Sequence, residues 1–423
     1  MIKYYVLNRF LYIRSYLKAS ALTFRSLRYR NFRYFFFGQF ISLPGVWIQN
    51  IALGWLVYRL TGSELMLGFV GFAGQIPALL LTPVAGVFAD RLAKRKVLVI
   101  TQSVSMLIAL SMSWLIFSGR IEVWHIVFSA VLNGISVAFD TPFRHAFLVD
   151  MITGREDLPN AIALNSTLFN TARFIGPPLG GLLIAWGGEG FCFLVNGLSY
   201  SAVIFSLLAM RLAPFVKRES HSTIFSDLFS GLQYANRNRH IRILLTMVAL
   251  TSLIGLPFQV FMPVFAHEVF AGDAQTLGYL TGAIGAGALT GAFFLASRQS
   301  LSSIPNIIFV SACMFSIGLV SFSLSSSLIF SLLILSITGF GMVVEFASSN
   351  TIIQTVVDDN MRGRVMALYS MSFLGITPLG SLLTGALAEW IGAPLTLTIT
   401  GSICLIAALW FYYKKHIIIK AVT

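Results

Sequence analysis

Two carboxylates lie at matching places inside otherwise apolar segments of this chain. Asp140 and Glu345 each follow a glycine by six residues, Gly134 and Gly339. An ionised carboxylate is costly in hydrocarbon, so an acid within a membrane segment is a candidate functional residue. Burial favours its protonated form and a nearby cation favours its ionised form, so such a group can exchange a proton as its surroundings change. The two positions predict proton-coupling groups in a duplicated membrane protein, which indicates transport.

The charged residues of these segments also have structural interpretations. Arg144 follows Asp140 by about one helical turn, so an ion pair would fix the inner end of that helix. Glu345 has no cation within a turn of its own helix. Arg173 lies deep in another apolar segment, where it needs a partner such as Asp140 or Asn133. It could equally bind an anionic substrate such as a catecholate or a carboxylate.

Uncharged polar side chains recur in the same segments. They could line a cavity for a substrate, or they could form hydrogen bonds between helices. Both interpretations stay open for Gln39, Gln49, Asn50, Asn133, Asn170 and Gln259. We expect no metal site and no cofactor, because the three cysteines are scattered and no paired metal ligands occur. No nucleophile motif occurs either, so we do not expect an enzyme.

The composition requires a membrane environment for the helices that hold these residues. The 423 residues are 57% hydrophobic and only 11% charged, whereas about a quarter of a soluble domain is charged. The apolar blocks are about twenty residues long, enough to cross the bilayer as helices. The net charge of +13 comes from Lys and Arg in every second connection. This pattern predicts cytoplasmic termini and an even number of spans rather than a nucleic-acid surface.

Twelve spans are expected in two repeated halves. Leu43-Pro44 corresponds to Leu256-Pro257, and Pro178-Leu-Gly180 corresponds to Pro378-Leu-Gly380. A parallel repeat of this kind is typical of a transporter with two six-helix bundles related by pseudo-two-fold symmetry, with the substrate path between them. Pro44 and Pro257 are expected to break their helices and free backbone carbonyls. The expected spans are 33–58, 66–88, 97–118, 123–146, 160–186 and 191–211, then 241–266, 275–297, 304–324, 328–352, 363–387 and 393–413.

The polar segments divide the chain further. The basic N-terminal extension is either an amphipathic helix on the membrane surface or a disordered tail. An amphipathic helix is expected in the linker, where Phe225, Leu228, Phe229 and Leu232 follow helical spacing. The expected organisation is an extension over 1–30, a bundle over 31–211, a linker over 212–240, a second bundle over 241–413 and a tail over 414–423.

The connection between the second and third spans resembles the signature of the major facilitator superfamily. It reads Gly86-Val-Phe-Ala-Asp90-Arg91-Leu-Ala-Lys94-Arg95-Lys96, with Ala93 where the family pattern usually has glycine. The resemblance implies a gating loop that latches the two halves in the outward-facing state; a plain basic loop is the alternative. Ser300 stands opposite Asp90 in the second half, so the latch is expected on one side only.

A motif in the fifth span resembles that of exporters within this superfamily. Its residues are Gly176, Pro177, Gly180 and Gly181, which could instead form only a packing kink. The stretches 139–147 and 158–165 resemble bacterial enterobactin exporters and related efflux proteins, and the likeness covers 27–413. It implies a monomeric, proton-coupled antiporter of the bacterial inner membrane, exporting a small amphipathic or aromatic molecule such as a siderophore or drugs by alternating access. An importer of a metabolite or metal chelate, and a membrane interaction protein that does not transport, are the alternatives.

Overall fold

The computed structural model describes residues 24–422 apart from 90, 213–223, 299–302 and 359. Within these residues every regular element is helical. Eleven of the helices are long and apolar enough to cross a membrane. One of them, α6, is 52 residues long and changes direction at Gly188, whose φ of 75° is not helical. The fifth and sixth expected spans are therefore joined through this glycine, and the described chain has twelve crossing segments.

The first half contains the helices before the linker. A short helix, η1, precedes them, and its Ser26 hydroxyl donates a hydrogen bond to Asn160 Oδ1 over 2.7 Å. Residues 25–28 of the predicted extension are thus attached to the bundle, whereas residues 1–23 lie outside the described part. The elements are η1 (Arg25–Arg28), α2 (Arg30–Thr61), α3 (Glu64–Ala89), α4 (Lys94–Phe117), α5 (Val123–Asp150), η2 (Arg155–Asp157) and α6 (Leu158–Ala209).

The second half follows the helix of the linker. The predicted linker helix is present as α7, where Phe229 and Leu232 are exposed. The last helix continues to Val422, so residues 414–422 of the predicted tail are helical. The elements are α7 (Ile224–Arg237), α8 (Arg239–Leu250), η3 (Thr251–Gly255), η4 (Leu256–Phe261), α9 (Met262–Val264), η5 (Phe265–Val269), α10 (Ala274–Ala296), α11 (Ile304–Ser323), α12 (Leu328–Val356), α13 (Arg362–Ser370), η6 (Met371–Gly375), α14 (Thr377–Ile391) and α15 (Ala393–Val422).

The two prolines that were expected to break helices behave differently. In the seventh span, Pro257 follows a π-helical turn, η3, and lies in a 3-10 segment, η4. Proline lacks the backbone N–H that an α-helical hydrogen bond needs. Pro44 lies inside α2, which continues as an α-helix from Arg30 to Thr61. The prediction of a broken first span was wrong. A single proline is tolerated there, whereas the seventh span has Gly255, Pro257 and Pro263 within nine residues.

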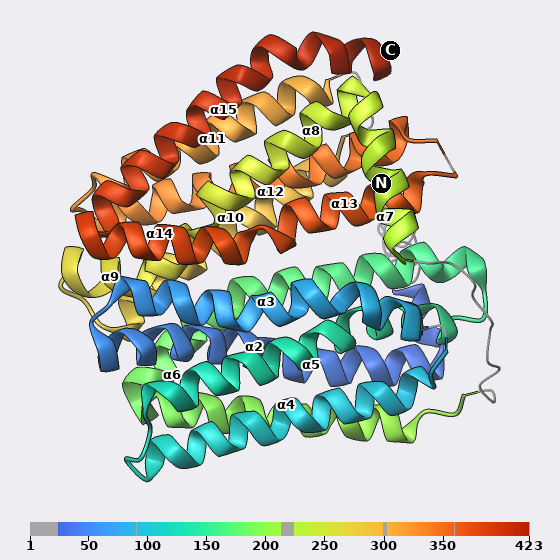
Figure 1. The fold of residues 1–423 in the computed structure, drawn as a ribbon. Coiled ribbons are helices and arrows are strands. Elements are labelled where there is room, and N and C mark those ends of the chain that lie inside the picture. The colour runs from blue at the N-terminus through green and yellow to red at the C-terminus, as the bar shows by residue number, and fades with distance from the viewer. Residues whose placement is uncertain (1–23, 90, 213–223, 299–302, 359, 423) are drawn as a thin grey trace, which may run out of the picture.

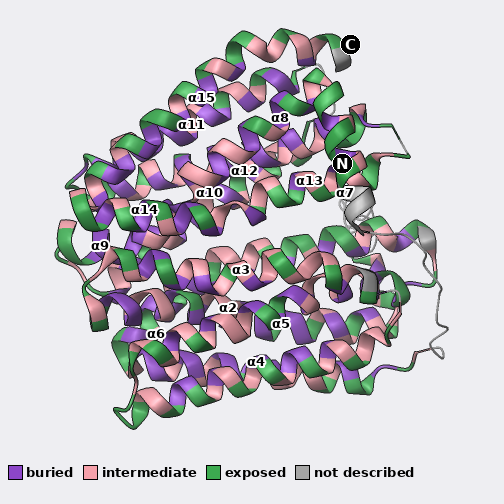
Figure 2. Cartoon of the chain, viewed as in Figure 1, coloured by how far each residue is buried: buried purple, intermediate pink, exposed green. Residues whose placement is uncertain are grey.

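The two halves lie one above the other in Figure 1, with α2 to α6 below and α8 to α15 above. Within each half the helices pack in pairs, α2 on α6 and α3 on α5 below, α10 and α11 on α12 above. Large apolar side chains such as Trp186 and Trp390 are exposed, and exposed residues, green in Figure 2, occur along the helices of both halves. A membrane would cover these side chains.

Glycines allow the halves to approach closely along two helix pairs. Gly68 of α3 lies against Gly385 of α14, and Gly181 of α6 lies against Gly278 of α10. Small residues of this kind let backbones meet at helix interfaces in membranes. We call the end of the molecule at which α4 begins and α15 ends the basic end; the C-terminus marks it on the right in Figure 1. The other end is called the opposite end.

Candidate transport site

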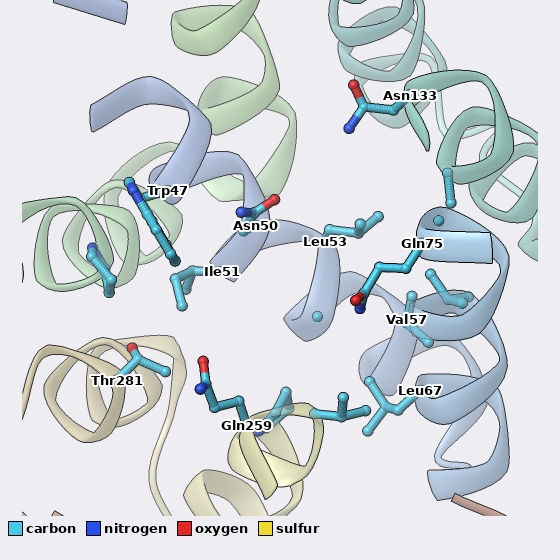
Figure 3. Close-up of a pocket in the computed structure, with 18 of the residues that line it drawn as sticks. Trp47, Asn50, Ile51, Leu53, Val57, Leu67, Gln75, Asn133, Gln259 and Thr281 are labelled. Carbon is cyan, nitrogen blue, oxygen red and sulfur yellow. The ribbon is translucent and has the colours of Figure 1, made fainter. Parts of the chain in front are cut away.

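A cavity of about 470 Å³ lies between the two halves. Its walls are mostly apolar, and a few polar side chains project into it from helices of both halves (Figure 3). A concave, largely apolar site with a few placed polar groups is typical of a small-molecule site. Its polar lining residues are Asn50, Gln75, Asn133, Arg173, Gln259 and Thr281, and its apolar ones include Trp47, Leu53, Val57, Leu67, Val70, Pro177 and Ile284.

The structure brings four of the five predicted substrate residues to this cavity. Asn50 of α2, Asn133 of α5, Arg173 of α6 and Gln259 of η4 all line it. Gln49 does not, because it points to the interior of the first half and accepts a hydrogen bond from Asn196 Nδ2 over 2.7 Å. Consecutive residues of an α-helix project about 100° apart, so Asn50 lines the cavity while Gln49 faces Asn196.

The lining residues that were not predicted include Gln75, Trp47 and Thr281. Gln75 lies between Gly74 and Pro77 in the second span. An amide between two helix-weakening residues is a sequence signal that could have identified it as a cavity residue. Trp47 and Thr281 have no comparable signal in the sequence, because apolar and small hydroxyl residues occur throughout the spans. Their place follows from the packing of α2 and α10 around the cavity.

Arg173 places a positive charge at the wall of the cavity. Its guanidinium lies over the ring of Trp47, 5.6 Å from the centroid. Among the described residues no ion pair or side-chain hydrogen bond joins Arg173 to a carboxylate, and the expected partner Asp140 is paired elsewhere. A cation within a membrane span normally pairs with an acid or carbonyl. The charge of Arg173 is therefore available to an anionic group in the cavity.

Asp140 lies away from the cavity, in the interior of the first half. Its side chain is 3% exposed and forms an ion pair with Arg144 one turn along α5. It also accepts hydrogen bonds from Gln102 Nε2 over 2.8 Å and Thr101 Oγ1 over 3.2 Å, both from α4. These donors stabilise the ionised carboxylate. The ion pair with Arg144, which was the structural alternative to a proton-coupling role for Asp140, is therefore present.

Glu345 is the buried acid of the second half and has different surroundings. Its side chain is 0% exposed, and Oε1 accepts a hydrogen bond from Thr251 Oγ1 of η3 over 2.8 Å. The other oxygen, Oε2, has no hydrogen-bond partner, and no ion pair involves Glu345 among the described residues. An unpaired charge in such a site costs several kcal/mol, so the surroundings favour the carboxylic acid.

The broken seventh span connects this acid to the cavity. Thr251, the partner of Glu345, and Gln259, which lines the cavity, are eight residues apart on the η3–η4 segment. The Nε2 of Gln259 also lies 3.7 Å from Met342 Sδ, on the same helix as Glu345. A movement of η3–η4 would therefore alter the surroundings of Glu345.

The predicted gating loop is attached to its own half in the structure. Lys94 forms a 2.7 Å ion pair with Asp150 at the end of α5. Arg95 donates hydrogen bonds to carbonyl oxygens at the end of α6, those of Leu208 over 2.6 Å and Met210 over 3.2 Å. Gly86 has open space around it, and the N–H of Arg91 donates to the Phe88 carbonyl. Asp90 lies outside the described residues.

The predicted exporter motif lies at two helix contacts. Gly176 and Gly180 face α2, next to Pro44 and Ile48, whereas Gly181 faces Gly278 of α10 in the second half. Pro177 lines the cavity. Gly181 is thus part of a close-packed seam between the two halves, whereas Gly176 and Gly180 pack within the first half. The helix α6 passes through the motif without leaving the helical conformation.

Hydrogen bonds join the two halves at the opposite end. The hydroxyl of Tyr58 donates to Glu268, and Glu389 accepts from the Ser63 hydroxyl over 2.8 Å and the Leu65 N–H over 3.1 Å. These contacts close the cavity on that side. Among the described residues, no group of three or more metal-ligating side chains could hold a metal ion.

Comparison with known proteins places these features in a family context. A family model described as "Transmembrane secretion effector" matches residues 21–421. The staphyloferrin A transporter of Staphylococcus aureus is 27% identical, and the match covers 90% of this chain and 96% of the relative. The multidrug efflux pump Tap of Mycolicibacterium fortuitum is 25% identical, with 82% and 86% covered. Macrolide efflux protein A of Streptococcus pyogenes is 20% identical, with 90% and 96% covered.

Solved transporter structures share the fold. A bacterial homologue of the human lysosomal transporter Spinster, in an inward-facing and unoccupied conformation, superposes with a TM-score of 0.70 at 13% identity, covering 93% of this chain and 98% of the other. The nucleoside transporter NupG also gives a TM-score of 0.70, at 14% identity with 90% and 98% covered. The expected architecture of two six-helix bundles is thereby confirmed.

Proposed function

Because the chain belongs to the transmembrane secretion effector family of the major facilitator superfamily, we propose that it exports a small amphipathic molecule in exchange for protons. The protein is a multi-pass membrane transporter whose relatives include efflux pumps. We place it in the bacterial inner membrane with the basic end in the cytoplasm, as the distribution of Lys and Arg favours. A monomer suffices for this activity, because one chain forms the whole cavity.

The observation that carries the proposal is the charge of Arg173 in the cavity. A cargo with an anionic group would pair with the guanidinium, while its apolar part would contact Trp47 and the aliphatic wall. The amides of Asn50, Asn133 and Gln259 offer further hydrogen bonds. Two relatives are named as a staphyloferrin A transporter and a macrolide efflux protein, which supports a small organic molecule as the cargo of this protein.

The structure corresponds to one state of an alternating-access cycle. The contacts of Tyr58 with Glu268 and of Ser63 with Glu389 close the end that we place outside. In this state cargo would enter from the cytoplasm. Opening of the outer end would require these hydrogen bonds to break and the basic end to close, with the loop of Lys94 and Arg95 as the candidate latch.

Glu345 is our candidate for the coupling proton, with Asp140 as a second candidate. In the outward-facing state Glu345 would take up a proton from outside, which would allow the neutral side chain to be buried as it is here. Cargo binding at Gln259 would shift η3–η4, expose Glu345 to water and release the proton to the cytoplasm. One proton would then enter for each cargo molecule that leaves.

Comparison of metabolites in a deletion strain tests the direction of transport. Spent medium and cell extracts of wild-type and deletion strains would be analysed by mass spectrometry after iron-limited and rich growth. We expect a compound that is missing from the medium and accumulates inside the deletion strain. If external compounds remain unconsumed and nothing accumulates inside, the protein is an importer and the proposed direction is wrong.

A further inference from the structure

A second hollow lies in the second half. It has a volume of about 400 Å³ and shares no lining residue with the cavity. Residues of α10, α11 and α12 form it, with α10 and α11 both packed on α12. Most of the lining is apolar and belongs to Phe294, Ile307, Val310, Met314, Phe340 and Val344. Val310 is 52% exposed, so this groove is open to the surroundings of the protein.

Three of the four polar residues that line the groove gather at the basic end, and the fourth, Ser311, lies further along α11. Arg298, Ser303 and Asn306 lie at the basic end, beyond the last apolar residues of the lining. The Arg298 guanidinium lies over the ring of Phe294, 4.5 Å from its centroid. Lys415 of α15 donates a 2.8 Å hydrogen bond to Asn306 Oδ1. Two cations therefore lie beside one mouth of an otherwise apolar groove.

No carboxylate neutralises Arg298 within the described part of the chain. Residues 297–303 contain no acid in the sequence. In the first half the basic residues of the corresponding connection have protein partners, Asp150 for Lys94 and two backbone carbonyls for Arg95. The second half thus retains a cation in this connection without the acid that would pair with it.

The dimensions of the groove match one leaflet of a bilayer. From Ser303 to Met314 the chain advances eleven residues along α11, which is about 16 Å at 1.5 Å per residue. The hydrocarbon core of a bilayer is about 30 Å thick, so the groove spans about half of it. Anionic headgroups are enriched in the cytoplasmic leaflet and attract basic residues near its surface.

We propose that this groove binds one anionic phospholipid of the leaflet at the basic end. The phosphate lies between Arg298 and Lys415, where the N-terminus of α11 adds the positive end of its helix dipole. One acyl chain follows α11 past Val310 and Met314. The bound lipid fills the space between α10 and α11 and neutralises the two cations.

Native mass spectrometry of the purified full-length protein in detergent tests the proposal. The protein would be delipidated and titrated with phosphatidylglycerol or with zwitterionic phosphatidylcholine, in the presence and absence of inorganic phosphate. We expect phosphatidylglycerol to bind more tightly than phosphatidylcholine, and inorganic phosphate at millimolar concentration not to displace it. Arg298→Gln should weaken phosphatidylglycerol binding about fivefold, the factor that corresponds to about 1 kcal/mol per basic residue near a membrane surface.

Two further variants show whether the weaker binding of phosphatidylglycerol is specific to the groove or follows from the loss of any basic residue. Arg30→Gln is the matched control, because Arg30 is also exposed at the basic end and its guanidinium lies 5.4 Å from the centroid of the Tyr34 ring, but it lines neither this groove nor the cavity. Val310→Trp fills the groove without changing a charge and should also weaken binding, so the test does not depend on the fold of Arg298→Gln. Equal binding of both lipids, equal loss in Arg30→Gln, or displacement by inorganic phosphate would each overturn the proposal.

Discussion

Replacement of Glu345 by glutamine should separate proton coupling from cargo binding. The side chain is buried, with one oxygen bonded to Thr251 and the other without a partner. Glutamine has the same shape, can accept the Thr251 hydrogen bond, and exchanges one unpartnered polar group for another. We therefore expect the free energy of unfolding to change by no more than about 1 kcal/mol. The variant should fold and enter the membrane, but it cannot release a proton.

The size of the transport defect follows from the single titratable group. With the membrane potential clamped at zero, one pH unit supplies 1.36 kcal/mol per proton, which drives about tenfold accumulation. A gradient of two pH units should thus give about 100-fold accumulation for an exchange of one proton. In Glu345→Gln, which carries no exchangeable proton at this position, the ratio of internal to external cargo concentration should fall to about one. Downhill exchange of cargo across the membrane should continue.

Uptake by everted membrane vesicles measures this ratio directly. Vesicles from cells with the wild-type protein or Glu345→Gln would be given an acidic interior and the compound that accumulates in the deletion strain. Glu156→Gln is the matched control, because that carboxylate is 72% exposed in the short helix η2. Accumulation by Glu345→Gln equal to that of the wild type would remove Glu345 from the mechanism.

Three further substitutions address the cavity, the seam and the closed end. Arg173→Gln should raise the KM for an anionic cargo about 10- to 150-fold, since a hydrogen bond to a charged group is worth about 1.5–3 kcal/mol; an unchanged KM in vesicle uptake would contradict the role of this cation. Gly278→Leu should destabilise the protein by about 1–3 kcal/mol, because even a Cβ there would lie 2.9 Å from the Pro177 carbonyl oxygen. Thermal unfolding in detergent would show this destabilisation as a lower Tm. Gly86→Ala is the control and should leave Tm unchanged, because Gly86 has open space around it. Equal losses of Tm in the two variants would refute the packing argument. Tyr58→Phe removes the hydrogen bond to Glu268 and should favour opening of the opposite end by about five- to thirtyfold, measured from spin-label distances between the two halves at that end; an unaltered distribution would show that the bond does not hold this end closed.

The fold was largely predictable because the bilayer imposes its own dimensions on the sequence. Apolar blocks of about twenty residues gave the spans, and the repeat of Leu43-Pro44 in Leu256-Pro257 gave two halves. The effect of proline was not predictable from the repeat alone. Pro44 stays within a continuous helix, whereas Pro257 shares its span with Gly255, which adds backbone freedom there.

The candidate site was predictable at the level of residue type but not of contacts. Amides in apolar segments are costly unless they have partners or face water, and this reasoning selected Asn50, Asn133 and Gln259. It also selected Gln49, whose partner Asn196 lies 147 residues away in the sequence. The residue that lies beside the Arg173 guanidinium, Trp47, likewise depends on how the helices are rotated against each other. Helical periodicity orders residues around one axis but does not fix the face that meets another helix.

Reconstitution of the purified protein would test the exchange of cargo for protons most directly. Vesicles with the protein and an internal pH-sensitive dye would receive an acidic interior and, outside, the compound that accumulates in the deletion strain. We predict that the compound concentrates inside while the internal pH rises faster than in protein-free vesicles. Equilibration of the compound without a pH change, or movement of compound and protons in the same direction, would contradict proton-coupled export.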